Sequence, residues 1–92
     1  MGQIVRFAFP EGGAKEDIEA DITLAIFTAE CVYGRPRVRM EASYLVDDDG
    51  MSCVIDVAGE SGEAAARVFT GLTAARVGEG AFTVRRLQAS PT

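Results

Sequence analysis

Histidine is absent from this sequence, and cysteine occurs only twice, as Cys31 and Cys53. Without histidine no Ser-His or Cys-His nucleophile pair can form, and the usual zinc ligand sets lose a member. The two cysteines form no CxxC motif, and the N-terminus lacks the charged and apolar regions of a signal peptide. We therefore expect reduced thiols, a cytoplasmic location, and no catalytic, cofactor-binding or metal-ligating residues.

Basic charge is scarce as well. The formal net charge is −5, and Lys15 is the only lysine. A general nucleic-acid binder carries a basic footprint, and anionic lipid surfaces attract basic segments. No apolar run approaches the ~20 residues of a membrane-spanning helix. Nucleic acids and membranes are therefore not expected partners. The preference for arginine, alanine and glycine is typical of a GC-rich bacterial genome.

The remaining composition is that of an ordinary globular protein. Of the 92 residues, 48% are hydrophobic and 25% are charged. We expect one domain over residues 1–92, with an ordered core over about 3–87 and a frayed tail over 88–92. The core of so small a domain gives limited stability, and oligomerisation is a common remedy.

Residues Asp17 to Tyr33 show apolar residues at helical spacing, and we expect this helix to start near Ala14. Gly34 is suited to cap its C-terminus, and Pro36 should prevent its continuation. One apolar stripe of the helix should face the core; it comprises Ile18, Ile22, Ala25, Ile26, Ala29 and Val32.

A second apolar stripe lies on roughly the opposite side of this helix. It contains Ala20, Leu24, Phe27 and Cys31. Aligned exposed apolar residues often mark interfaces. We therefore expect a protein contact at Leu24, Phe27 and Cys31, unless the C-terminal tail or the loop at Pro10 covers them.

Four segments alternate between apolar and polar residues, as strands do. They are Gln3 to Phe9, Arg37 to Asp47, Met51 to Ala58, and Ala81 to Leu87. The Asp48-Asp49-Gly50 step predicts a hairpin turn between the second and third of them, because glycine accommodates a positive φ.

A second helix is expected over about Glu63 to Val77, with Ser61 as its N-cap. Gly71 should weaken this helix by about 1 kcal/mol relative to alanine. Gly78-Glu79-Gly80 should end it. Its core-facing stripe comprises Ala65, Val68, Phe69, Leu72 and Ala75.

The predicted element order is β-α-β-β-α-β. This order predicts an α+β, ferredoxin-like fold: an antiparallel sheet with strands ordered 4-1-3-2 and two helices on one face. Exchange of strands between two subunits is the main rival arrangement. Asparagine is absent, which removes the Arg-plus-Asn water-positioning site of acylphosphatase-like members of this topology.

The face of the sheet without helices carries mixed charged and apolar residues in this arrangement. They are Arg6, Arg37, Arg39, Arg85, Glu41, Asp56, Ile4, Val54 and Leu87. Three interpretations are open: a solvated face with cross-strand pairs such as Arg6 with Asp56, a subunit interface, and RNA binding. RNA binding to a sheet uses stacked aromatics, and no aromatic residue points from this face in the expected register.

Two loops invite a ligand interpretation that their chemistry does not favour. Asp47-Asp48-Asp49-Gly50 lacks the alternate spacing and the later glutamate of a calcium loop. Gly59-Glu60-Ser61-Gly62 precedes a helix, but Glu60 and Glu63 would repel a bound phosphate. We interpret the first as a hairpin turn and the second as a loop with an N-cap.

These patterns favour a non-enzymatic protein-interaction module that binds another protein or, as a homodimer, itself. Two groups of residues are candidates for the contact: Leu24, Phe27 and Cys31 on the first helix, and Ile4, Arg6, Val54 and Leu87 on the open sheet face. The alternative is a small-molecule-sensing module similar in layout to ACT-type regulatory domains, with ligand contacts at Ser61, at the glycines after the third strand (Gly59 and Gly62) and at the Gly12-Gly13 loop. A small enzyme that uses arginine and carboxylate groups is the remote alternative.

Overall fold

The computed structural model describes residues 3–88 of the chain. The elements in chain order are β1 (Gln3–Ala8), α1 (Lys15–Tyr33), α2 (Arg35–Glu41), β2 (Ala42–Val46), β3 (Ser52–Val57), α3 (Glu60–Val77), a 3₁₀ turn η1 (Glu79–Ala81) and β4 (Thr83–Gln88). Gln88 thus still belongs to a strand, and the rest of the expected tail lies outside the described residues. Within residues 3–88 no helix is both long enough and apolar enough to cross a membrane.

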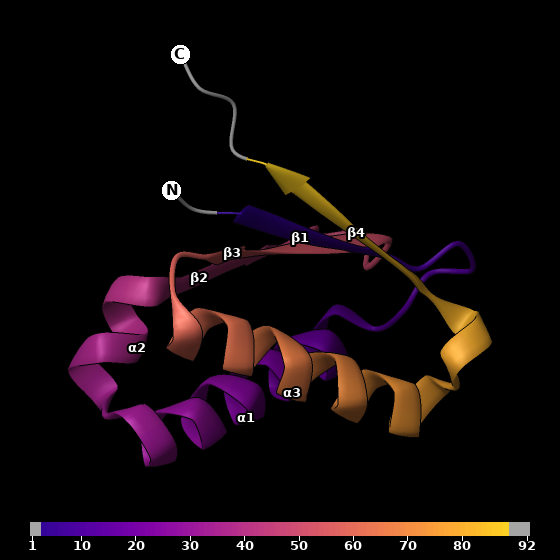
Figure 1. Cartoon of the computed structure of the whole chain (residues 1–92). Helices are drawn as coiled ribbons and strands as arrows, with labels where there is room; N and C mark the ends of the chain where they lie inside the picture. Colours follow the sequence, from indigo (N-terminus) through magenta and orange to yellow (C-terminus); the bar gives the residue numbers. More distant parts are fainter. Residues whose placement is uncertain (1–2, 89–92) are drawn as a thin grey trace.

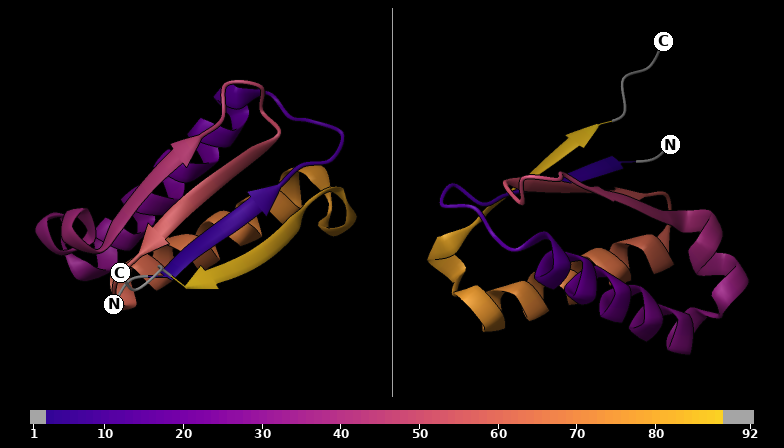
Figure 2. Two further views of the ribbon diagram at one scale, coloured as in Figure 1. Left: turned by 90° about the horizontal axis from the view of Figure 1, so that it is seen from above. Right: turned by 180° about the vertical axis from the view of Figure 1, so that it is seen from behind.

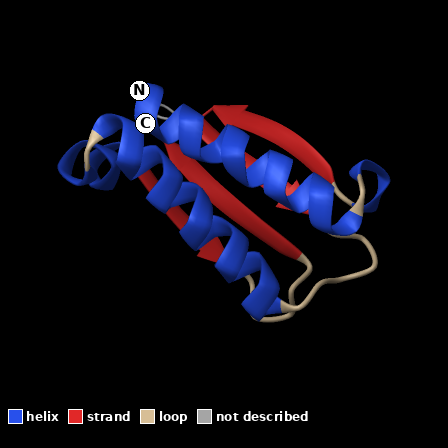
Figure 3. Ribbon diagram, turned by 90° about the horizontal axis from the view of Figure 1, so that it is seen from below, coloured by secondary structure: helices blue, strands red, loops and turns tan. Residues whose placement is uncertain are grey.

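The four strands form one antiparallel sheet in the order β2-β3-β1-β4. Read from the β4 edge, this is the expected order 4-1-3-2. Helices α1 and α3 lie side by side beneath one face of the sheet, and no helix of residues 3–88 covers the other face (Figures 1 and 3). The chain is therefore an α+β fold with three helices packed against a four-stranded sheet. It does not follow the expected β-α-β-β-α-β order, because α2 is an additional helix.

The core lies between the sheet and the two long helices. Phe7 at the centre of β1 packs edge-to-face on Phe69 of α3, with ring centroids 4.7 Å apart. Of the stripe of α1 expected to face the core, Ile18 and Ile22 are fully buried, whereas Val32 in the last turn is 72% exposed. Cys53, Ile55 and Val57 of β3 also face this core, as their alternation predicts. The same alternation would also place Met51 inward, but Met51 lies in the turn before β3 and is 42% exposed.

The predicted strand over Arg37 to Asp47 is wrong in its first half. Residues Arg35–Glu41 form helix α2, and only Ala42–Val46 form a strand. Gly34, at φ +91°, ends α1 and lets the chain turn at once into the new helix. Pro36 sits in the first turn of α2, where a missing N–H costs nothing, so it starts a helix rather than only ending one. Val38 is fully buried on α2 against Ala29 and Ala65.

The turn between β2 and β3 confirms the predicted hairpin. Gly50 has φ +70°, and its N–H donates to the carbonyl of Asp47 over 3.0 Å. The carboxylate of Asp49 accepts the N–H of Met51 over 2.9 Å, and that of Asp47 accepts the hydroxyl of Ser52. These bonds hold the acidic side chains in a turn, as their sequence suggested.

Helix α3 begins three residues earlier than expected. Its N-terminus packs against the end of α2, at the same end of the molecule (Figure 1). Ser61 lies inside the first turn and is buried, so it is not the N-cap. Its hydroxyl and its N–H both donate to Oε1 of Glu41, over 2.6 and 3.1 Å. The cap of α3 is therefore a carboxylate that arrives from α2.

Candidate functional site

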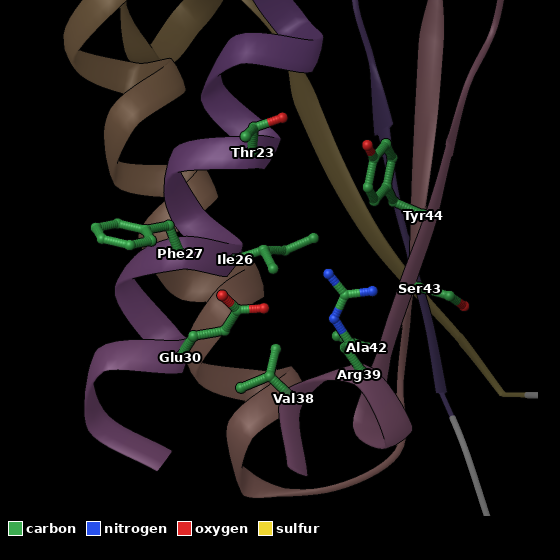
Figure 4. A pocket seen from close by; sticks show the side chains of 9 residues that line it. All are labelled: Thr23, Ile26, Phe27, Glu30, Val38, Arg39, Ala42, Ser43 and Tyr44. Atoms are coloured by element: carbon green, nitrogen blue, oxygen red, sulfur yellow. The ribbon is translucent and has the colours of Figure 1, made fainter. Parts of the chain in front are cut away.

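A groove of about 580 Å³ runs between α1 and the edge strand β2, and α2 lies at one end of it. Ile26 and Tyr44 point toward each other from the two walls (Figure 4). Glu30 and Arg39 also extend toward each other across the space. The residues lining the groove are Thr23, Ile26, Phe27, Glu30, Val38, Arg39, Ala42, Ser43 and Tyr44.

Large apolar side chains are exposed on both walls of this groove. Phe27 on α1 is 59% exposed and points away from the sheet (Figure 4). Tyr44 and Leu45 on β2 are 42% and 65% exposed, on opposite faces of the sheet. This side of the molecule therefore offers apolar area both above and below a strand edge.

The outer edge of β2 also offers backbone hydrogen-bonding groups. The N–H of Asp47 donates to the carbonyl of Ser52, and the N–H of Ala58 donates to the carbonyl of Glu41. Bonded pairs alternate along an antiparallel ladder, so the backbone groups of Ser43 and Leu45 also point toward β3. Those of Tyr44 and Val46 then point outward, to the side where no further strand lies within residues 3–88.

The two edges of the sheet differ in chemistry. Strands β2 and β4 form these edges (Figure 2). Strand β4 carries Arg85 and Arg86 at its centre, whereas β2 consists of uncharged residues throughout. Charged side chains on an edge strand oppose pairing with another strand. Edge β2 lacks this protection.

The ends of β2 carry opposite charges. Arg35, Arg37 and Arg39 lie on α2 before its first residue. Asp47, Asp48 and Asp49 follow its last residue. Arg37 is paired with Glu41 and Asp48 with Lys15, and the carboxylates of Asp47 and Asp49 accept hydrogen bonds from Ser52 and Met51. Within residues 3–88, Arg35 and Arg39 make no ion pair.

The residues of the first predicted contact group lie on one exposed side of α1. Leu24 and Phe27 are 49% and 59% exposed on α1, and Cys31 is exposed beside them in the helical stripe. Of the three, Phe27 also lines the groove. The structure thus joins the predicted helix stripe to an edge strand that the sequence did not mark.

The second predicted group lies on the open sheet face, but with fewer charges than expected. Ile4 stands between Asp56 and Leu87, and Arg6 stands between Val54 and Arg85. Arg6 and Asp56 are thus diagonal neighbours rather than directly opposed. Arg37, Arg39 and Glu41 were placed on this face by the predicted strand, which is wrong because all three belong to α2.

Ser61, a residue of the predicted small-ligand site, has both of its hydrogen-bond donors engaged within the protein. Both of its donors bind Glu41, and a Cβ added at Gly62 would meet the Glu41 carbonyl oxygen at 2.1 Å. This corner is filled by protein atoms. A ligand at Ser61 would have to displace the Glu41 carboxylate.

The two cysteines have different environments. Cys53 is buried in the core, and this burial, together with the nearby Asp47 carboxylate, raises the pKa of its thiol to about 12. Such a thiol stays protonated at neutral pH and is a weak nucleophile. Cys31 is exposed on α1.

The structure is therefore an α+β fold with four antiparallel strands, in which the uncharged edge strand β2 lies beside an apolar groove. Comparisons with protein-family models, with curated proteins and with solved structures found no match.

Proposed function

We propose that this protein is a cytoplasmic, non-enzymatic interaction module that forms a homodimer through its β2 edge and the neighbouring flank of α1. The observation that carries the proposal is the groove, where exposed apolar side chains on two walls adjoin a strand edge with outward backbone groups. Phe27 belongs to both the helix stripe and the groove. Burial of such apolar area is the main driving force for association.

We also infer that the fold is a ferredoxin-like one into which α2 has been inserted. The strand order 4-1-3-2 and the two long helices on one face support this interpretation. The insertion has a functional consequence in this proposal, because α2 supplies Val38 and Arg39 to the groove.

Sedimentation equilibrium at several concentrations tests the dimer, and two variants with the same change of charge identify its surface. We expect Phe27→Glu to raise the dissociation constant at least tenfold, which is about 1.4 kcal/mol, because it places a carboxylate in the contact. Leu87→Glu changes the open sheet face and should leave the constant within twofold. The reverse result would move the contact to the open face. A monomer at all concentrations would contradict the proposal.

A second candidate function is small-molecule sensing in the same groove. Its volume lies within the range of ligand pockets, and Glu30 and Arg39 offer opposite charges on facing walls. These groups suit a ligand with both an amine and a carboxylate, such as an amino acid. A thermal-shift screen tests this candidate, because a ligand that binds only the native state raises the midpoint. No shift at millimolar amino acids would count against it.

A further inference from the structure

We propose that the occupant of the β2 edge is β2 of a second copy, paired antiparallel about a two-fold axis at Tyr44. The two sheets then join into one of eight strands. This inference rests on the proposed self-association and adds its geometry: the pairing strand, its direction and its register.

The direction follows from the backbone and from symmetry. Tyr44 and Val46 direct their N–H and C=O groups away from β3, so they are the residues that can bond an added strand. Two identical edges that pair in a closed dimer are related by a two-fold axis, which makes the added strand antiparallel.

The register follows from the length of the strand. Strand β2 covers Ala42–Val46, and Tyr44 is its central residue. With the axis at Tyr44, every residue of β2 has a partner: Tyr44 opposes its own copy, Ala42 opposes Val46, and Ser43 opposes Leu45. A shift by two residues in either direction leaves two residues of each strand without partners. It also changes which residues lie across from each other on the open face.

The charges at the ends of β2 explain why a second copy suits this edge. In the antiparallel dimer the arginine end of each strand lies over the aspartate end of the other. In this register Glu41, the last residue of α2, lies opposite Asp47 of the second copy, and Arg35 and Arg39 of α2 lie at the same end as these two carboxylates. Opposite charges across an interface favour one orientation over the alternatives. A parallel arrangement would place like charges together.

The groove does not oppose this arrangement. Glu30 is an acidic residue on its α1 wall, and Arg39 points toward it (Figure 4). The apolar side chains of the groove, Ile26, Phe27 and Tyr44, are then brought close to the same groove of the second copy.

The same reasoning disfavours the β4 edge. Arg85 and Arg86 lie at the centre of β4, so pairing two β4 strands would bring four guanidinium groups together. Arg86 is engaged with Glu63, which reduces but does not remove this cost. Edge β2 has no such charge.

Cysteine cross-linking tests which residues of the two paired β2 strands lie opposite each other. In the Cys31→Ser background, Ser43→Cys and Leu45→Cys are prepared as separate proteins, mixed in equal amounts and oxidised. Opposed residues whose backbone groups point away from the partner strand have Cα atoms about 4.5 Å apart, which suits a disulfide. Two copies of Ser43 are offset by two residues, about 8 Å apart, which is beyond the reach of a disulfide. The same holds for two copies of Leu45.

We expect the mixture to cross-link at least tenfold more than either variant alone. Arg85→Cys mixed with Leu87→Cys, which has the same spacing on β4, is the matched control and should not cross-link. Cross-linking of Ser43→Cys alone or Leu45→Cys alone would overturn the register. Cross-linking of the β4 pair would overturn the choice of edge.

Sedimentation of the same samples under reducing conditions separates this proposal from the one on which it depends. A dimer whose mixture does not cross-link would overturn β2 pairing while self-association stands. A monomer would overturn both. A dimer in which the mixture alone cross-links supports both.

Discussion

Glu41 is the residue that joins α2, β2 and α3. Its carbonyl accepts the N–H of Ala58 over 2.8 Å, and its carboxylate accepts both donors of Ser61. Gly59 and Gly62 leave the space that it fills, since a Cβ at either position would lie 2.5 Å or less from a Glu41 atom. The Glu41 carboxylate, together with the packing of Val38 on Ala65, therefore holds α2 to the start of α3.

This arrangement predicts a pH dependence of stability. The hydrogen bond from the Ser61 hydroxyl, helped by the Ser61 N–H and by Arg37, holds the pKa of Glu41 below its ordinary value of 4.5. A group whose pKa is lowered by folding contributes stability above its unfolded pKa and loses it as pH falls through the folded pKa. We expect urea unfolding to show a loss of stability as pH falls below about 4.5, and a smaller loss in Glu41→Gln. Asp48 and Glu63 also have lowered pKa values, so some acid dependence should remain. Equal slopes in the two proteins would contradict the role of Glu41.

The same substitution, glycine to alanine, should have opposite effects on stability at two positions of α3. Gly71 is exposed and has open space around its would-be Cβ, so Gly71→Ala should stabilise the protein by about 1 kcal/mol. Gly62→Ala should destabilise it by about 1–3 kcal/mol, because the new methyl group meets backbone atoms of Glu41. Urea unfolding of both variants measures the difference. Two stabilised variants would mean that the α2–α3 corner is looser than described.

The thiols provide a third test at the scale of residues. Cys53 is 1% exposed with a thiol pKa of about 12, whereas Cys31 is exposed on α1. We expect the native protein to react rapidly with one equivalent of a thiol reagent. Cys31→Ser should react only after denaturation. Rapid reaction of native Cys31→Ser would show that the core opens readily.

At the scale of elements, most helices and strands follow from periodicity, and α2 does not. In α1 the helical spacing of Ile18 and Ile22 has no competing pattern over nineteen residues. Before β2, Val38 and Met40 alternate with arginines and so resemble a strand. Only the pair of Gly34 and Pro36 indicates a helix there, because glycine at a C-cap followed by proline suits the end of one helix and the start of another. Seven residues are too few for the helical period to show clearly.

If residues 35–41 form a helix rather than a strand, truncation of Val38 and truncation of Met40 should have different effects on stability. Val38 is fully buried and Met40 is 85% exposed, although in a strand both would share one face. We expect Val38→Ala to cost about 2 kcal/mol from the loss of two buried methyl groups. Met40→Ala should change stability by less than about 0.5 kcal/mol. Similar costs for the two variants, measured by urea unfolding, would favour the strand.

At the scale of the whole molecule, part of the candidate site could be predicted from sequence. The exposed stripe of Leu24, Phe27 and Cys31 follows from the helical period, because the other stripe must face the core. The groove could not be predicted, since it is formed by α1, α2 and β2 together and α2 was read as strand. The strand order implies that β2 lies at an edge of the sheet. That this edge strand carries no charge could not be predicted, because the expected strand over Arg37 to Asp47 also contained the charged residues of α2.

The contrast between the two edge strands limits how far the proposed association can extend. Each copy has one uncharged edge, β2, and pairing two copies uses both of these edges. The joined sheet then ends on both sides in β4, which carries Arg85 and Arg86. No edge suited to a third copy remains, so the assembly is finite rather than fibrous. We expect the average mass in sedimentation to reach a plateau at two copies as concentration rises, and continued growth would show that β4 edges also pair.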